Sequence, residues 1–538
     1  MIKYIIPFCF LILSSAYSQH LPKLFEIGTN SSLQKVDSET PASNSINDIL
    51  IVGDTIWLAT SRGLSRSTDK GVSWKNYYGS PSFGTESITA VGYHKNIIWA
   101  ATAHSIERDG QTLPEGSGLR FSTDNGENWY TVGQPLDADD DSIEVYGINN
   151  IRALPVTVAV QNITYDIAFT QNTIWLATFA GGVRRNNIDS LLAYQNHKWK
   201  RVVIPPDRLD SISPHDTLNF SLQPVAGKFG KESNLNHRAF SVIAINDTTV
   251  LIGTANGINK SITNVNDNSQ GGISWVKYNH KNQDDPISGN FIVAMNYSRN
   301  QNIIWASTWK AEDQDEFYGI SFSDNGGLSW KTALRDEKVH NFGVDNTSGV
   351  VIATSSSGAF LNVAGLDRWL LTGQIVDKKT KLTLRTTHFY SAGFLGNESI
   401  WLGSTNGLVI NTSPSHFWRD DWTILFASQP LENKEDTYAF PNPFSPRSEQ
   451  VKIKYGTGGK TVSATIRILN FNMNVVRTLV QNATRGNPYH SISSTDSGVI
   501  DFWDGRDDAG NIVPNGVYFY RIDIDSGDPI FGKIMVLQ

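Results

Sequence analysis

The chain has 538 residues, a formal net charge of −7 and one cysteine, Cys9. This weak negative charge argues against a nucleic-acid partner, which requires a basic stripe. A single cysteine excludes a disulfide framework, so any metal site would need His, Asp, Glu or backbone oxygen ligands. Its 15 Trp, 18 Tyr, 25 Phe and 44 Gly favour an all-β protein rich in turns.

The first residues, MIKYIIPFCFLILSSAYSQ, have the pattern of a secretory signal peptide. Lys3 is the positive start, Tyr4 to Leu13 the apolar run, and Ala16-Tyr17-Ser18 a small-x-small cleavage site. A lipoprotein signal is disfavoured because Cys9 lies inside the apolar run. No stretch approaches the roughly 20 apolar residues of a transmembrane helix. We therefore predict a signal peptide over 1–18, a secreted or cell-surface protein and no transmembrane segment.

Residues 21–428 contain seven copies of one pattern. Each has an apolar strand, a second strand, a turn with a short third strand and usually a fourth led by an aromatic residue. The second strands are TIWLAT (from Thr55), IIWAAT (from Ile97), TIWLAT (from Thr173), TVLIGT (from Thr249), IIWAST (from Ile303), GVVIAT (from Gly349) and SIWLGS (from Ser399). Four-stranded repeats of about 40–50 residues are typical of a β-propeller, in which each sheet covers its neighbours.

We therefore predict a seven-bladed β-propeller over 21–428. Six or eight blades stay open as alternatives, because the third repeat contains a long insertion. The segment Leu21 to Thr29 is expected to add a strand to the last blade and close the ring. The insertion from Asp207 to His237 is long for a loop and is interpreted as a lid over the channel mouth.

An acidic segment, DADDDSIE, runs from Asp137 to Glu144. Its alternating carboxylates resemble the ligand spacing of a calcium loop, but the segment lacks the glycine that makes the sharp turn. We interpret it as a solvated acidic loop, and we predict no metal site and no cofactor.

A second motif recurs as STDKGVSW, STDNGENW and FSDNGGLSW. It decays from repeat to repeat: Gln270 replaces the aspartate in the fourth, and the third, sixth and seventh keep only Trp199, Trp369 and Trp422. A catalytic group would not tolerate such decay, whereas a turn can. The motif therefore predicts a structural role.

The motif resembles the Asp-box, or BNR repeat, of sialidases, sortilins and related propellers. The chain is thus similar to sortilin-like and two-component-regulator-like β-propellers. The resemblance implies a hairpin turn on the outer part of each blade, with the aspartate on backbone N–H groups and the tryptophan packed between strands. The residues it assigns are Ser67, Asp69, Gly71, Trp74, Ser122, Asp124, Gly126, Trp129, Asp324, Gly326 and Trp330.

No catalytic motif accompanies the repeats. HExxH, GxSxG and GxxxxGK[ST] are absent, and the one Arg-containing phrase near the sialidase pattern, IRALP (Ile151 to Pro155), follows two boxes instead of preceding the first. We therefore predict no catalytic residue and an exported, non-catalytic binding module for a glycan, peptide or protein ligand. The alternative is an exported glycosidase, sialidase-like or otherwise, that uses carboxylates at the propeller mouth.

The ligand site is predicted at one mouth of the central channel, where the first strands of the repeats begin. Aligning the repeats places four chargeable residues there, one from each of four blades: Glu86, Arg238, His340 and His388. Arg238 would bind an anion through its planar fork, and the histidines would tighten binding below about pH 6.5. The alternative is that strand starts at a wet channel mouth are polar without binding anything.

After a charged linker over 429–437, residues 438–538 contain short alternating strands and the turns DDAGN and PNG, which predicts a β-sandwich. The phrases FPNPF, WDGRDDAGNIVPNGVYFYRI and GKIMVL resemble the FlgD-type Ig-like domain, which is similar to the sorting domains of type IX secretion. The resemblance implies outer-membrane secretion machinery as a partner. The alternative is an Ig-like accessory domain without an export role.

Overall fold

The computed structural model describes residues 23–28, 39–193, 198–222, 234–311, 313–362, 368–378, 383–412, 418, 421–428, 431, 437–447, 449–458, 460–486 and 499–538. Strands dominate these residues; the helices among them are α1 (Ile188–Leu192) and a single 3₁₀ turn (Leu235–His237). The predicted all-β fold is confirmed. The predicted signal peptide, 1–18, lies outside the described residues. No helix in the described part of the chain has the length and apolarity needed to cross a membrane.

Within residues 46–425, the described part of the chain forms seven antiparallel sheets of four or five strands. Three of them precede the long insertion. They contain β1 (Ile46–Val52), β2 (Thr55–Thr60), β3 (Leu64–Ser67) and β4 (Lys75–Asn76); β5 (Ser87–His94), β6 (Ile97–Arg108), β7 (Gln111–Ser122) and β8 (Tyr130–Val132); and β11 (Thr164–Thr170), β12 (Thr173–Thr178), β13 (Gly182–Asn187) and β14 (Lys200–Arg201). A separate hairpin joins β9 (Ile143–Tyr146) to β10 (Asn149–Arg152).

The remaining four sheets follow the same order. They contain β16 (Ala239–Asn246), β17 (Thr249–Thr254), β18 (Gly257–Ser261) and β19 (Trp275–Tyr278), with β15 (Ser211–Ile212) added at the outer edge; β20 (Phe291–Ser298), β21 (Ile303–Trp309), β22 (Gly319–Ser323) and β23 (Lys331–Ala333); β24 (Val339–Val344), β25 (Val351–Ser355), β26 (Ala359–Asn362) and β27 (Trp369–Leu371); and β28 (Phe389–Leu395), β29 (Ser399–Ser404), β30 (Gly407–Asn411) and β31 (Trp422–Leu425).

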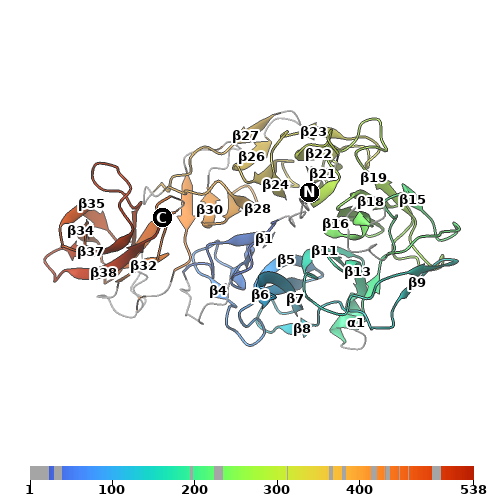
Figure 1. The fold of residues 1–538 in the computed structure, drawn as a ribbon, viewed down its shortest axis with the longest axis horizontal. Coiled ribbons are helices and arrows are strands. Elements are labelled where there is room, and N and C mark those ends of the chain that lie inside the picture. The colour runs from blue at the N-terminus through green and yellow to red at the C-terminus, as the bar shows by residue number, and fades with distance from the viewer. Residues whose placement is uncertain are drawn as a thin grey trace, which may run out of the picture.

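The first strand of each sheet lines a common axis. Neighbouring first strands contact one another in the order β1, β5, β11, β16, β20, β24 and β28, and β28 contacts β1 again. Figure 1 shows these sheets arranged around a central space, so the fold is a β-propeller. Second strands such as β2 are buried along almost their whole length, because both faces of each sheet are covered by its neighbours; this explains their continuous apolar runs.

The predicted outer turns connect the third and fourth strands, and each packs on the preceding sheet. A side chain at Gly71 would meet the ring of Trp401, and one at Gly126 would meet the ring of Trp57. Gly71 has φ of +87° and Gly126 of +83°, a region that favours glycine. The first turn thus contacts the last sheet, and it helps to close the ring.

In the first turn, the Asp69 carboxylate accepts hydrogen bonds from the Ser67 hydroxyl (2.8 Å), the Ser73 amide (2.9 Å) and the Ser73 hydroxyl (2.6 Å). The second turn repeats this with Asp124, which accepts from the Ser122 hydroxyl and the Asn128 amide. The aspartate therefore recurs because it stabilises the turn, and these contacts require no catalytic role.

The third turn corrects the assignment of Asp324 and Gly326. Asn325, not Asp324, accepts from the Ser323 hydroxyl (2.9 Å) and the Ser329 amide (3.1 Å). Gly327, not Gly326, donates its amide to the Ser323 hydroxyl, as Gly71 does to Ser67. The motif therefore starts at Ser323 and has the same length as the other two, with asparagine in place of aspartate.

Replacing Asn325 by alanine is expected to lower the free energy of unfolding by about 1 kcal/mol, because the turn loses its side-chain acceptor. Asp324→Ala is the matched control. Asp324 is exposed and, among the described residues, pairs with Lys331 at the surface, so its loss should cost less than about 0.5 kcal/mol. Urea unfolding of both variants checks the register; the reverse order of effects would restore the original assignment.

The prediction that the acidic segment is a solvated loop is wrong for its first residue, Asp137. This carboxylate is buried and bound by protein groups, so it is not a free calcium ligand either. The Asp137 side chain is 2% exposed and lies against two arginines. Arg184 donates to it through both terminal nitrogens, at 2.5 and 2.9 Å, and Arg201 approaches to 3.2 Å. Burial would raise the pKa of Asp137, but the hydrogen bonds from Arg184 hold it below its usual value. The segment anchors the third sheet.

Among the described residues of the 207–237 insertion, Leu235 packs with Phe25 and Tyr165 at the strand-start end of the axis, and the lid stays a prediction. β15 pairs with β19 at the outer edge of its sheet, away from the axis. The Asp207 carboxylate accepts from the amides of Leu235 and Asn236 and fixes the turn before β16. Residues 223–233 of the insertion lie outside the described residues.

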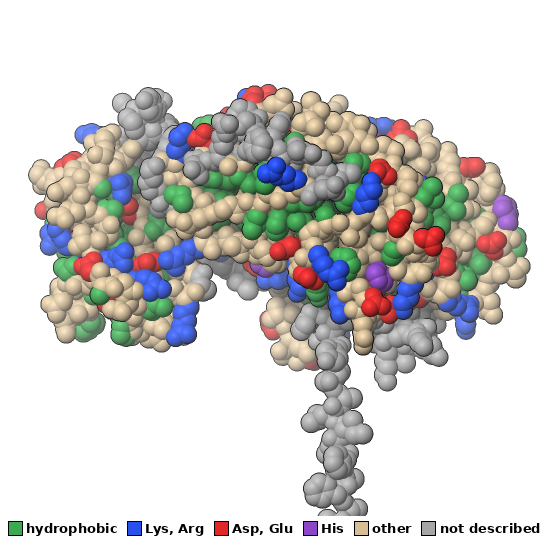
Figure 2. All heavy atoms as spheres, turned by 90° about the horizontal axis from the view of Figure 1, so that it is seen from above, with side chains coloured by type: hydrophobic (Ala, Val, Ile, Leu, Met, Phe, Trp, Pro, Cys, Tyr) green, Lys and Arg blue, Asp and Glu red, His purple; other side chains and the backbone are tan. Residues whose placement is uncertain are grey.

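Residues 437–538 form two further sheets. One contains β32 (Thr437–Phe440), β33 (Val451–Tyr455) and β36 (Val499–Trp503); the other contains β35 (Val475–Arg485), β34 (Val462–Leu469), β37 (Gly516–Ile524) and β38 (Ile530–Val536). They share one core that includes Ile453, Ile466 and Trp503. The Lys452 ammonium donates to Asn406 at 3.0 Å, which ties these sheets to the propeller. Figure 2 shows acidic and basic side chains interspersed on the face in view.

Candidate binding cavity

Every first strand of the propeller has a β-bulge at the same place. In β1 the pairing with β2 skips Asn47, and the corresponding shift occurs in all seven sheets. The skipped residues are Asn47, Thr89, Tyr165, Phe240, Val293, His340 and Tyr390. A bulge leaves one residue unpaired and re-aims the side chains around it. Because the bulge occurs at the same point in every first strand, residue positions in different blades can be compared by counting from it.

A cavity of about 850 Å³ lies along this axis. At one end it reaches Leu24 and Phe25, and at the other it reaches Gly53 and Gly396, in the turns that join first to second strands. Both glycines and Arg299, which lies at the same end, are exposed. This end of the cavity is its open mouth.

The opposite end is closed by residues 23–28, which form no strand. The expected closing strand from Leu21 to Thr29 is therefore wrong for its described part. Phe25 packs against Tyr165 with ring centroids 5.1 Å apart. The Asn47 side chain accepts from the Glu26 amide and donates to the Glu26 carbonyl, each at 3.0 Å. The segment acts as a plug at the strand-start end.

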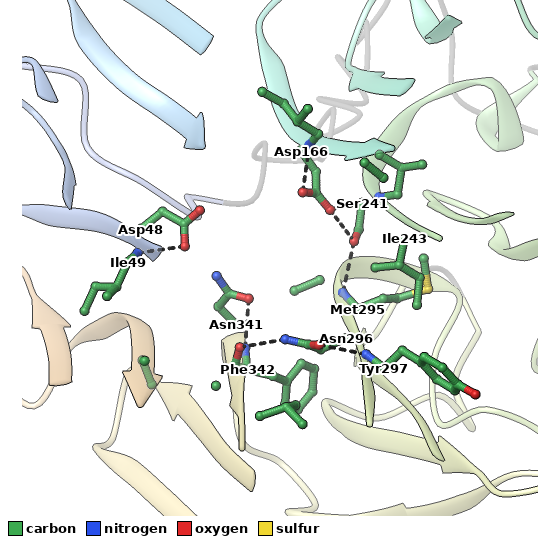
Figure 3. A pocket seen from close by; sticks show the side chains of 18 of the residues that line it. Asp48, Ile49, Asp166, Ser241, Ile243, Met295, Asn296, Tyr297, Asn341 and Phe342 are labelled. Atoms are coloured by element: carbon green, nitrogen blue, oxygen red, sulfur yellow. Dashed lines mark hydrogen bonds between the residues drawn. The ribbon is translucent and has the colours of Figure 1, made fainter. Parts of the chain in front are cut away.

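Two aspartates lie one residue after the bulge and line the cavity (Figure 3). Asp166 accepts from the amides of Ile167 (2.8 Å) and Val242 (2.9 Å) and from the Ser241 hydroxyl (2.8 Å). Asp48 accepts from the Ile49 amide at 2.9 Å. Burial raises the pKa of Asp48 to about 6 and that of Asp166 to about 7. Each carboxyl group therefore loses its proton closer to neutral pH than an exposed aspartate does.

Amides complete the polar lining on the other side of the cavity. Asn296 donates to the Phe342 carbonyl (3.1 Å) and accepts from the Tyr297 amide (2.7 Å), while Asn341 accepts from the Phe342 amide (2.8 Å). Figure 3 shows these side chains and the two aspartates around one open centre. The sequence carried a signal for the aspartates that our prediction missed: INDILIV and ITYDIAF each place a charge inside a strand expected to be buried.

The four residues predicted at the mouth do not share one register. Counted from the bulge, Glu86 lies three residues before it, Arg238 and His388 two before it, and His340 at the bulge itself. Of these four, His340 is the one that lines the cavity. The alignment failed because it started from the first apolar residue, and the length of the approach to each bulge differs between blades.

Glu86 and Arg238 have local partners. Glu86 accepts from the Ser117 hydroxyl at 2.7 Å and lies 3.3 Å from the His104 ring nitrogen. The Arg238 guanidinium lies over the Phe179 ring at 5.0 Å, and burial lowers the pKa of Arg238 to about 10. Both side chains are therefore held by neighbouring protein groups near the starts of the first strands, and neither contact requires a ligand.

The structure brings the two histidines together. Their rings stack at 5.0 Å, and the Nε2 atoms of His340 and His388 lie 3.0 and 3.3 Å from the Ser356 hydroxyl. Burial lowers the pKa of His340 to about 3 and lowers that of His388 as well. Burial thus disfavours the charged form of both histidines, and the predicted anion site stays a prediction. No cluster of three His, Cys, Asp or Glu in the described part of the chain could hold a metal ion.

No protein-family model and no curated protein matches the chain. Among solved structures, it is similar to an ancestral GH74 enzyme at 13% identity, covering 94% of this chain and 64% of the enzyme, with a TM-score of 0.47. It is also similar to PorZ, a surface component of the type IX secretion system of Porphyromonas gingivalis, at 12% identity, with 92% and 75% covered and a TM-score of 0.25.

A third similar structure is the extracellular domain of BT4673 from B. thetaiotaomicron, at 11% identity, with 92% of this chain and 86% of that one covered and a TM-score of 0.33.

Proposed function

We propose that the chain is an exported, non-catalytic binding module whose ligand occupies the central cavity. The observation that supports this most directly is the shape of the cavity: about 850 Å³, open at one end and plugged at the other, with polar and aromatic side chains from all around the ring. Concave sites of this size with a few convergent polar groups are typical of ligand pockets.

The contacts of the two aspartates favour binding over catalysis. Asp166 uses both carboxylate oxygens to hold the amides of its own strand and of β16. These hydrogen bonds fix the position of the Asp166 carboxylate, and each oxygen keeps a lone pair for a ligand, so the contacts suit a group that binds a ligand.

The proposal includes the features expected from sequence: a signal peptide over 1–18, seven blades with Asp-box turns, and a FlgD-type Ig-like domain over 438–538 that engages the secretion machinery. The described sheets support the seven-blade count and a sandwich-like C-terminal unit, because seven sheets of four or five strands close on one axis and two further sheets share a separate core. A secreted or cell-surface location follows from the signal peptide.

One observation favours a glycosidase as the second candidate. Two carboxyl groups lie in one cavity, and burial raises the pKa of each, to about 6 and about 7; glycosidases use such a pair, one as acid and one as base or nucleophile.

A glycan array combined with a polysaccharide digestion screen of the purified protein separates the two candidates. Retention of a glycan without released sugars is expected. Released reducing sugars that disappear in Asp166→Asn would replace the binding proposal by the hydrolase. Asp69→Asn, an equal charge change on an outer turn, is the control and should alter neither readout.

A further inference from the structure

The open mouth of the cavity has a collar of aromatic side chains. Residues four positions after each bulge lie at this level, and all seven line the cavity. Four of them are aromatic: Tyr93, Phe169, Tyr297 and Phe394, which we call the aromatic collar. None of the four is fully buried, and Tyr93 is 37% exposed. Aromatic faces attract organic cations, most strongly where water is partly excluded.

The floor of the cavity is acidic and has no cation of its own. We call Asp48 and Asp166 the acidic floor. In the described part of the chain neither forms a salt bridge, whereas the buried Asp137 carboxylate contacts two arginines. Burial of two carboxylates without a counter-ion is costly. Burial raises the pKa of Asp166, and the nearby Asp48 charge raises it further.

The other groups around the floor do not supply the missing charge. His340 lines the cavity, is 4% exposed and is neutral, because burial lowers its pKa to about 3. Its Nδ1 atom has no hydrogen-bond partner among the described residues. Asp345, which also lines the cavity, accepts from the amides of Thr347 and Ser348. Arg299 lies at the exposed rim.

The plug sets the direction of entry. Phe25 and the paired Glu26 backbone block the strand-start end at the level of the bulges. A ligand must therefore pass the aromatic collar before it reaches the acidic floor. The two levels are three residues apart along each strand, which corresponds to roughly 10 Å at the usual rise of a strand.

From these observations we propose that the cavity binds an extended aliphatic ammonium ion, with its charge at Asp48 and Asp166 and its hydrocarbon stem within the aromatic collar. This rests on the proposed function, since it assumes that the cavity is the ligand site. The ammonium would give each carboxylate the counter-charge it lacks. A free polyamine and the lysine side chain of a peptide share this chemistry.

Calorimetric titration at pH 8, where both floor residues are ionised, tests the proposal with the purified protein. The probes are 1,5-diaminopentane and spermidine for a free amine, N-acetyl-lysine methylamide for a peptide side chain, and 1,5-pentanediol as the neutral match. We expect measurable binding of the amines and at least tenfold weaker binding of the diol. Equal affinities for the diol and the diamine would overturn the proposal.

Substitutions in the acidic floor and in the aromatic collar test which side chains contact the amine. Asp48→Asn and Asp166→Asn should each weaken diamine binding at least tenfold, while Asp69→Asn should leave it unchanged. Tyr93→Leu keeps an apolar side chain at a partly exposed position, so it should fold normally and weaken binding about three- to tenfold through loss of the ring. Unchanged affinity in Tyr93→Leu and in both floor variants would sink the inference.

The same experiments distinguish failure of the cationic ligand from failure of the cavity as the ligand site. A glycan retained by the protein in a way that Asp166→Asn abolishes, with no amine bound, would keep the cavity as the ligand site and refute only the cationic ligand. Amine binding that the floor variants do not weaken would refute the assignment to this cavity.

Discussion

Replacing Asp137 by alanine is expected to lower the free energy of unfolding by about 3–5 kcal/mol. The substitution leaves the Arg184 guanidinium, whose side chain is 1% exposed, without the carboxylate that receives two of its hydrogen bonds. Arg201, 3% exposed, loses the same partner. Breaking a buried ion pair by removing one partner is strongly destabilising, because a charge stays buried and uncompensated.

Chemical denaturation of Asp137→Ala beside Asp139→Ala measures this effect. Asp139 belongs to the same acidic segment but is exposed, so its loss should change the stability by less than about 0.5 kcal/mol. Similar small effects in both variants would restore the view that the segment is a solvated loop. A large effect confined to Asp137 identifies it as an anchor of the third sheet.

The second large effect is a pH-dependent one at His340. Its ordinary pKa is 6.5, and burial lowers it to about 3 in the folded protein. His388 and Lys338 make smaller contributions in the same direction. Because the folded pKa is depressed, the neutral imidazole stabilises the fold above pH 6.5, and this contribution is lost as the pH falls towards 3. Between pH 7 and pH 4 the loss amounts to about 3 kcal/mol.

His340→Gln should therefore destabilise the protein at pH 7, and the difference from wild type should shrink by about 2–3 kcal/mol by pH 4. Asp166→Asn should show the opposite trend. Its carboxyl pKa is raised from 3.8 to about 7, so its contribution is present below pH 3.8 and is lost as the pH rises through 7. Urea unfolding at pH 4, 5.5 and 7 measures both.

His215→Gln, at an exposed histidine, is the control for loss of a surface imidazole and should change the stability at pH 7 by less than about 0.5 kcal/mol. A constant difference for His340→Gln would mean that the imidazole is not held neutral by the fold.

Local patterns in the sequence determined the strands and their repetition. The second strands were found because their apolar runs recur and because both faces of a blade are buried, which requires apolar residues at every position. The outer turns were found because serine, aspartate, glycine and tryptophan act within eight residues of one another. Even the third turn was readable from its spacing: counting from Ser323 gives the same interval to Trp330 as in the other two.

Only the tertiary structure decided which residues meet at the axis. A β-bulge depends on the pairing between two strands, and no residue type marks it, so the register of Glu86, Arg238, His340 and His388 could not be read correctly from the chain. The partner of Asp137 lies 47 residues away.

The plug and the acidic floor were likewise decided by contacts distant in sequence. Residues 23–28 close the cavity because Phe25 meets Tyr165 and the Glu26 backbone meets Asn47, and Asp48 faces the same space as Asp166 although they belong to different blades (Figure 3). The sequence determined that each blade forms, because those interactions are local or repeated. Closure of the ring determined what the cavity contains, because it brings single residues from separate blades to one axis.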